Sequence, residues 1–156
     1  MSIRQNILDN IRTDLLTIDG TGDYTNTISK AFKDLRFVGD LTDSDFDACY
    51  IGAGKDLVTV MGDYLKRCEL TIHGLIYYYT DVDTQNAGTL ETKAETLIED
   101  LYTLNESWTN ALASTDGDSK LAVESMELVS VMPYINVGFP DRGEIEIELK
   151  IIYHRS

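Results

Sequence analysis

The sequence has few basic residues, and this shortage narrows the classes of partner that the protein can bind. Its 156 residues include 13 lysines and arginines against 27 aspartates and glutamates, for a formal net charge of −14. The densest basic cluster is the pair Lys66-Arg67. Nucleic acid binding depends on basic side chains that neutralise phosphates and release counterions, so we do not expect conventional DNA or RNA binding. The acidity indicates either simple solubility or a surface past which DNA slides without sticking.

Long apolar runs are also missing, and cysteines are scarce. No run approaches the roughly 20 apolar residues that a membrane-spanning helix needs. The N-terminal residues are not followed by an apolar stretch that ends in small residues, so we expect no signal peptide. The two cysteines, Cys49 and Cys68, form no close pair, and each lies in an apolar, strand-like context. We expect buried, reduced thiols, with a disulfide or a metal site as the alternative.

No catalytic motif is recognisable in the sequence. Residues 50–60, YIGAGKDLVTV, look like the start of a phosphate-binding loop. Such a loop needs Ser or Thr after its lysine, but Lys55 is followed by Asp56, and Cys49 stands where the loop needs its first glycine. A phosphate loop should also open a helix, whereas the residues that follow have the pattern of a strand. We therefore predict a glycine-rich turn between two strands.

Two acidic patterns also have simple explanations. Residues 43–47, DSDFD, have the alternating aspartates of a calcium loop but lack the glycine and the glutamate that complete it, which favours a solvated acidic loop. Glu144, Glu146 and Glu148 share one face of a predicted strand. They would suit acid–base catalysis only in a cleft that raises one pKa, and the sequence gives no sign of such a cleft. The histidines belong to no zinc motif or catalytic triad.

Hydrophobic periodicity predicts two helices and several strands. An apolar residue recurs every three or four positions from Ile3 to Ile18, and the pattern stops at Asp19-Gly20. A second helical stripe runs from Leu90 to Trp108. Alternating, β-branched and aromatic residues predict strands, which we place at 30–38, 48–52, 67–80, 121–132 and 143–153.

The elements therefore follow the order helix, short strands, long strand, helix, two strands. Nothing repeats internally, and no linker divides the chain. We predict a single α+β domain over residues 1–156, with a mostly antiparallel sheet and two helices packed on one face.

This order of elements resembles the tail terminator (tail completion) proteins of long-tailed bacteriophages with non-contractile tails. The segments that carry the resemblance are 3–34, 46–56, 65–79, 90–108 and 123–154. They are similar to the family's opening helix with the strand that follows it, its short strand ended by a glycine turn, its long central strand, its second helix and its closing pair of strands. The chain departs from the family at Ala48-Cys49, where a proline is often found.

The resemblance implies a structural role, with no enzymatic activity and no cofactor. Family members form six-fold rings that cap the head-proximal end of the tail tube, stop its polymerisation and dock onto the head. For this chain the resemblance implies a hexameric homo-oligomer whose partners are the tail tube protein and a head-completion or connector protein. Its expected location is the head-proximal end of the tail in the virion, and the host cytoplasm during assembly. DNA would pass through the ring without specific binding.

A ring subunit must leave strand edges or sheet faces free for its neighbours. The candidate interface residues are Lys55, Leu75, Tyr77 and Tyr79. Packing by the domain's own helices would explain the last three equally well.

An acidic channel lining is the corresponding prediction for Glu144, Glu146 and Glu148. Two alternative classes stay open. A head-completion or tail-tube protein would share the size, the acidity and the strand content. A small enzyme or ligand-binding domain would need a pocket with converging polar groups, and the sequence reveals none.

Overall fold

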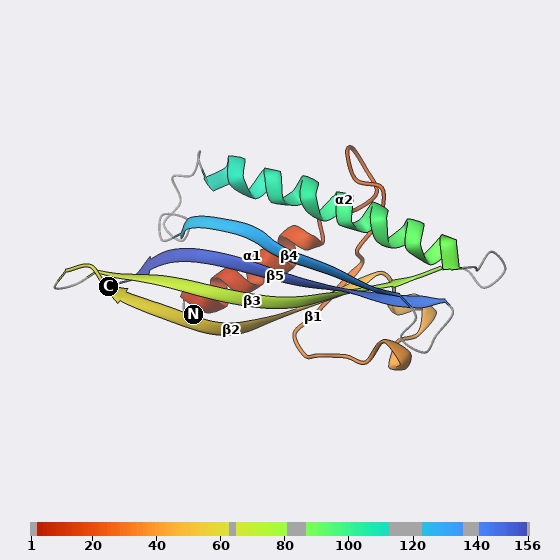
Figure 1. Cartoon of the computed structure of the whole chain (residues 1–156), viewed down its shortest axis with the longest axis horizontal. Helices are drawn as coiled ribbons and strands as arrows, with labels where there is room; N and C mark the ends of the chain where they lie inside the picture. Colours follow the sequence, from red (N-terminus) through yellow and green to blue (C-terminus); the bar gives the residue numbers. More distant parts are fainter. Residues whose placement is uncertain (1–2, 63–64, 81–86, 113–122, 136–140, 156) are drawn as a thin grey trace.

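The computed structural model describes residues 3–62, 65–80, 87–112, 123–135 and 141–155. Figure 1 shows the helices lying beside a long, twisted sheet. The elements are α1 (Ile3–Leu15), β1 (Lys30–Phe32), the 3-10 helices η1 (Val38–Asp40) and η2 (Asp43–Asp45), β2 (Ala48–Val60), β3 (Lys66–Tyr79), α2 (Ala87–Leu112), β4 (Val123–Ile135) and β5 (Arg142–Arg155). The predicted α+β class is confirmed.

The five strands form one sheet in the order β1-β2-β3-β5-β4. β1 runs parallel to β2, and every other neighbouring pair is antiparallel, so the mostly antiparallel sheet is also confirmed. β3 and β5 pair along their whole length, from Lys66–Arg155 to Tyr79–Arg142. The two stretches with the clearest alternation in the sequence therefore lie side by side.

The side chains of one face of the sheet, called the core face below, share one hydrophobic core with both helices. Alternation along a strand places every second side chain on this face. β3 contributes Cys68, Leu70, Ile72, Ile76 and Tyr78, and β5 contributes Ile145, Ile147, Leu149, Ile151 and Tyr153. Both cysteines are buried in this core with free thiols, as the sequence predicts.

The helix α1 also satisfies backbone groups of the sheet. β1 pairs only with Ala48–Tyr50, and beyond that point two arginines of α1 reach the carbonyl oxygens of β2. The buried Arg12 guanidinium donates to the Ile51 oxygen at 2.8 Å, and Arg4 donates to the Gly54 oxygen at 3.1 Å. An unpaired strand edge is a site of unwanted pairing, and these side chains cover part of it.

The predicted turn within residues 50–60 is wrong, because these residues belong to the single strand β2. The register against β3 shifts between Ala53 and Asp56, which places Gly54 and Lys55 together opposite one residue of β3 and forms a β-bulge. A Cβ atom on Gly54 would lie 2.8 Å from the Thr71 oxygen, so a glycine is needed where the strands approach. After the bulge, the Asp56 carboxylate accepts a hydrogen bond from the Tyr153 hydroxyl at 2.8 Å.

The strand predicted at 30–38 is much shorter, since β1 ends at Phe32. The alternating pattern extended the prediction through Leu35 and Phe37, but their side chains are 65% and 57% exposed and belong to a segment that leaves the sheet. Of the predicted acidic loop, Asp43–Asp45 form η2. There Asp45 accepts a hydrogen bond from the Thr42 backbone at 2.9 Å and pairs with Lys30 at 2.7 Å.

Candidate functional site

The face of the sheet opposite the core, called the outer face below, carries the residues that the sequence singled out. The register between β3 and β5 places Tyr77 beside Glu144, Leu75 beside Glu146 and His73 beside Glu148. The predicted interface residues of β3 and the predicted channel-lining residues of β5 are therefore neighbours in adjacent strands.

The apolar part of the outer face is covered by the chain's own residues 33–47, called the covering segment below. Val38 and Leu41 of this segment form a second, small core with Ala48 and Tyr77. Leu75 packs against the same core, and Tyr79 stacks on Phe46 with ring centroids 5.5 Å apart.

Tyr77 anchors the covering segment through its hydroxyl group. The hydroxyl donates to the Arg36 oxygen at 2.8 Å and accepts from the Arg36 nitrogen at 3.2 Å. Burial raises the pKa of Tyr77 to about 12, so the hydroxyl keeps its proton and remains a donor at neutral pH. Contact with residues 33–47, rather than with the helices, thus accounts for the apolar character of Leu75, Tyr77 and Tyr79.

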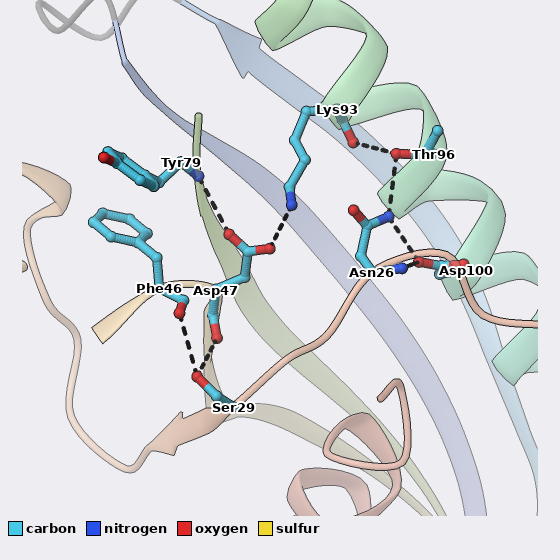
Figure 2. Close-up of polar contacts among 8 residues, drawn as sticks. All are labelled: Asn26, Ser29, Phe46, Asp47, Tyr79, Lys93, Thr96 and Asp100. Carbon is cyan, nitrogen blue, oxygen red and sulfur yellow. Dashed lines mark hydrogen bonds and ion pairs between the residues drawn. The ribbon is translucent and has the colours of Figure 1, made fainter. Parts of the chain in front are cut away.

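A buried polar junction fixes the end of the covering segment (Figure 2). The Asp47 carboxylate pairs with the Lys93 ammonium of α2 at 2.8 Å and accepts a hydrogen bond from the Tyr79 nitrogen at 3.3 Å. The Asp47 oxygen of the backbone accepts from the Ser29 nitrogen at 2.8 Å. Burial raises the pKa of the Asp47 carboxyl, and the nearby Lys93 charge opposes that shift.

A second buried carboxylate, that of Asp100 on α2, holds the chain just before β1. Asp100 is only 2% exposed, and it accepts from the backbone nitrogens of Thr25 and Asn26, each at 2.9 Å. The Asn26 side-chain amide donates to Asp100 at 2.8 Å and to the Thr96 hydroxyl at 3.1 Å. Figure 2 shows Asp47 turned toward Lys93 of α2 and the Tyr79 nitrogen, and Asp100 of α2 turned toward Asn26.

The surface beside this junction is hollowed over about 390 Å³. Its lining residues are Thr25, Asn26, Thr27, Asp43, Phe46, Asp47, Tyr79 and Lys93. The main polar groups of the hollow have partners within the protein: Asp47 pairs with Lys93, and Asn26 is bonded to Asp100, so we interpret the hollow as a structural junction. Among the described residues, no group of three or more histidine, cysteine or acidic side chains is arranged to hold a metal ion.

The carboxylates of Glu144, Glu146 and Glu148, called the carboxylate row below, lie on β5 beside Tyr77, Leu75 and His73; Glu146 is exposed and the other two are half-buried. In the part of the chain that the structure describes, no basic nitrogen lies within 4.0 Å of any of them. Partial burial, and then the neighbouring Glu146 charge, raise the pKa of Glu144. Glu146 in turn raises the pKa of Tyr134 on β4 by its charge and its hydrogen bond. The row is therefore an uncompensated strip of negative charge.

The sequence analysis missed the most apolar exposed surface. Figure 1 shows the β2–β3 hairpin extending beyond both helices at one end of the molecule. This hairpin end, defined as Lys55–Met61 with Leu65–Arg67, carries five large apolar side chains that are 44% to 69% exposed. They are Leu57, Val58, Val60, Met61 and Leu65. Their signal in the sequence is a run in which apolar residues do not alternate with polar ones, so both faces of the strand are apolar.

Lys55, the fourth predicted interface residue, is exposed at the bulge where this hairpin end begins. Lys66 and Arg67 lie on the opposite strand, and Lys66 pairs in register with Arg155 of β5. The hairpin end therefore combines apolar and basic side chains in a strongly acidic protein.

Comparison with known proteins assigns no family to this chain. No protein-family model matches the sequence, and no curated protein matches it. No helix in the described part of the chain is long and apolar enough to cross a membrane.

The raised pKa of Asp47 predicts a pH-dependent stability difference. The folded state keeps the Asp47 proton at pH values where the unfolded chain, with a pKa of about 3.9, has lost it. The stabilisation that comes from keeping Asp47 protonated in the fold is therefore fully present below about pH 3.9, and it is lost as the pH rises through the folded-state pKa of Asp47. Urea unfolding between pH 3 and 7 should show the stability of the wild type falling relative to Asp47→Asn as the pH rises.

Asp45→Asn is a matched control of opposite sign. The hydrogen bond from Lys30, and then that from the Thr42 backbone, hold the pKa of Asp45 at about 2. Its stabilisation is present above about pH 3.9 and is lost as the pH falls, so the wild type should gain on this variant as the pH rises. If the difference in free energy of unfolding between wild type and Asp47→Asn does not change with pH, the raised pKa of Asp47 is wrong.

Tyr77→Phe should loosen the covering segment, because both Arg36 backbone groups lose their partner. We expect the free energy of unfolding to fall by about 0.5–1.5 kcal/mol, the net contribution of a hydrogen bond, since water can reach the exposed Arg36 backbone. Limited trypsin digestion should then cut faster after Lys33 and Arg36 than in the wild type. Tyr102→Phe, on the exposed face of α2, should leave both measurements unchanged. Equal cleavage rates in all three proteins would show that Tyr77 does not hold the segment.

Proposed function

We propose that this protein is a ring-forming structural subunit of a long-tailed bacteriophage with a non-contractile tail. In this role it caps the head-proximal end of the tail tube, stops tube polymerisation and provides the surface that joins the tail to the head. The observation that carries the proposal is the hairpin end, where five large apolar side chains are exposed together. Exposed apolar patches of this kind are typical of surfaces that bind other proteins.

The arrangement of the sheet supports a role in assembly. A subunit that forms a closed ring by head-to-tail contacts must present two different surfaces, one for each neighbour. Among the described strands, the sheet has two long edges that no further strand pairs with. One is β4, and the other is the part of β2 beyond Tyr50, where the pairing with β1 ends.

The charge distribution supports a ring around DNA. The net charge is −14, and the carboxylate row is not neutralised by any described basic side chain within ion-pair distance. Such a surface repels phosphates, so the genome can pass without being bound. Under this proposal the protein contacts the tail tube protein on one side and a connector protein on the other. Its place is the head-proximal end of the tail in the virion.

The nearest alternative is another head–tail or tail-tube subunit, because open sheet edges also support filaments. Electron microscopy of the purified protein, alone and mixed with tail tubes, distinguishes these roles. We expect closed six-fold rings, either free or at one end of the tubes, and tubes that stop growing once capped. Long tubes formed by the protein itself would favour a tail-tube subunit. A protein that stays monomeric at high concentration and does not bind tubes would contradict the proposal.

The carboxylate row can be tested separately as the channel lining. Changing Glu144, Glu146 and Glu148 together to lysine should slow DNA passage by about tenfold or more, because the channel would attract phosphates instead of repelling them. DNA ejection from phages that carry the triple variant measures this effect. The matched control changes three exposed glutamates of α2 to lysine, namely Glu91, Glu95 and Glu99. If phages that carry the triple variant eject DNA normally, the carboxylate row does not line the channel.

A further inference from the structure

Two surfaces at opposite edges of the sheet carry most of the exposed apolar side chains of the described residues. Among the described residues, twelve large hydrophobic side chains are exposed, and eight of these lie in the hairpin end or on β4. The three on β4 are Val129, Met132 and Tyr134. The register with β5 places Met132 beside Glu146 and Tyr134 beside Glu144, so the exposed side chains of this part of β4 lie on the outer face.

Both surfaces are also edges of the sheet. β4 is the last strand on one side, and among the described strands nothing pairs with β2 beyond Tyr50 on the other side. The arginines of α1 cover the carbonyl oxygens of Ile51 and Gly54, and Arg4 also pairs with the Asp56 carboxylate at 3.4 Å, so their contacts end at the first residues of the hairpin end. In the part of the chain that the structure describes, no strand pairs with β2 from Lys55 onward on this side, and none pairs with the outer side of β4, where the Leu128 nitrogen donates to Asn105 of α2 at 2.9 Å.

The charges of the two surfaces are complementary. Lys55 and Lys66 are exposed at the hairpin end. The apolar residues of β4 are flanked by the exposed carboxylates of Glu127 on the same strand and Glu146 on β5. Apolar residues bordered by basic side chains thus occur at one edge, and apolar residues bordered by acidic side chains occur at the other. Complementary charge around an apolar centre is the arrangement that selects and orients a protein partner.

We propose that the hairpin end of one copy docks on β4 of the next copy around the ring. This inference rests on the proposed function and names its subunit contact. A second copy is the favoured occupant because the surface that the hairpin end needs, apolar residues beside carboxylates that pair with no described basic side chain, is present on the chain itself. The two surfaces lie at opposite edges, so each copy engages two neighbours at once, and such head-to-tail contacts form a ring when the rotation between successive copies closes. Leu75, Tyr77 and Tyr79, which contact the covering segment, take no part in this contact between copies.

Cysteine cross-linking tests the contact directly. The native thiols are buried, so cysteines introduced at exposed positions are the reactive ones. The double variant Val60→Cys with Met132→Cys, treated with a short bismaleimide, should give a ladder of covalent oligomers that ends at the ring. Each single variant should remain monomeric on a denaturing gel, because a head-to-tail contact never brings two copies of the same position together. Leu35→Cys with Met132→Cys is the matched control and should give no ladder.

Charged substitutions test the same contact without cross-linking. Val60→Asp and Met132→Asp should each raise the protein concentration needed for half-assembly by about tenfold, the effect of losing one important apolar contact. Leu35→Asp places the same charge at a position that is 65% exposed and outside both surfaces, and it should assemble like the wild type. All three positions are exposed, so the monomers should keep their fold, which circular dichroism verifies.

The possible results separate the two proposals. If the wild type forms rings but the double cysteine variant gives no ladder, this contact is wrong and the ring-forming function stands. Dimers from Val60→Cys alone would overturn the contact as well, since they require hairpin ends that meet each other. Rings that form normally from Val60→Asp but no longer bind tail tubes would assign the hairpin end to the tube. A wild type that forms no ring, alone or on tubes, contradicts the proposed function, and this inference fails with it.

Discussion

The ion pair between Asp47 and Lys93 is the contact on which the arrangement of the outer face depends. Asp47 lies where the covering segment enters β2, and its carboxylate contacts both α2 and the backbone end of β3. A buried ion pair adds little net stability, but the loss of one partner leaves an uncompensated charge and costs several kcal/mol. The main effect of the pair is therefore to fix where the covering segment lies, because it ties this segment to α2 and to β3.

This constraint divides the outer face into two parts with different properties. Near the junction, the covering segment buries Tyr77 and shields Leu75, so that this part of the sheet is closed by the chain itself. Away from the junction, Glu146 and the exposed residues of β4 meet solvent, and Glu144 and Glu148 are half-buried. The strands also extend past the helices, which leaves the hairpin end with two uncovered faces (Figure 1). The surfaces available for assembly are those that neither the helices nor the covering segment reaches.

Local periodicity predicted the regular elements of this fold. It failed where a bulge interrupts the alternation and where an alternating segment does not join the sheet. The stripe from Ile3 and the alternation of β3 and β5 depend on burial of one side only, so their patterns are unambiguous. The bulge at Gly54-Lys55 shifts the alternation by one residue, and the sequence then resembled a turn. At Leu35 and Phe37 the chain alternates like a strand, although no neighbouring strand of the described sheet pairs with it.

Alternation along a strand is a local property of the backbone, so the sequence is enough to predict that Glu144, Glu146 and Glu148 share one face. What covers each face depends on the tertiary fold. A partner surface, a helix and a distant loop all bury an apolar side chain equally well, so burial preference cannot identify the covering element. The choice among them depends on contacts between residues far apart in the chain, such as Arg36 with Tyr77 and Asp47 with Lys93.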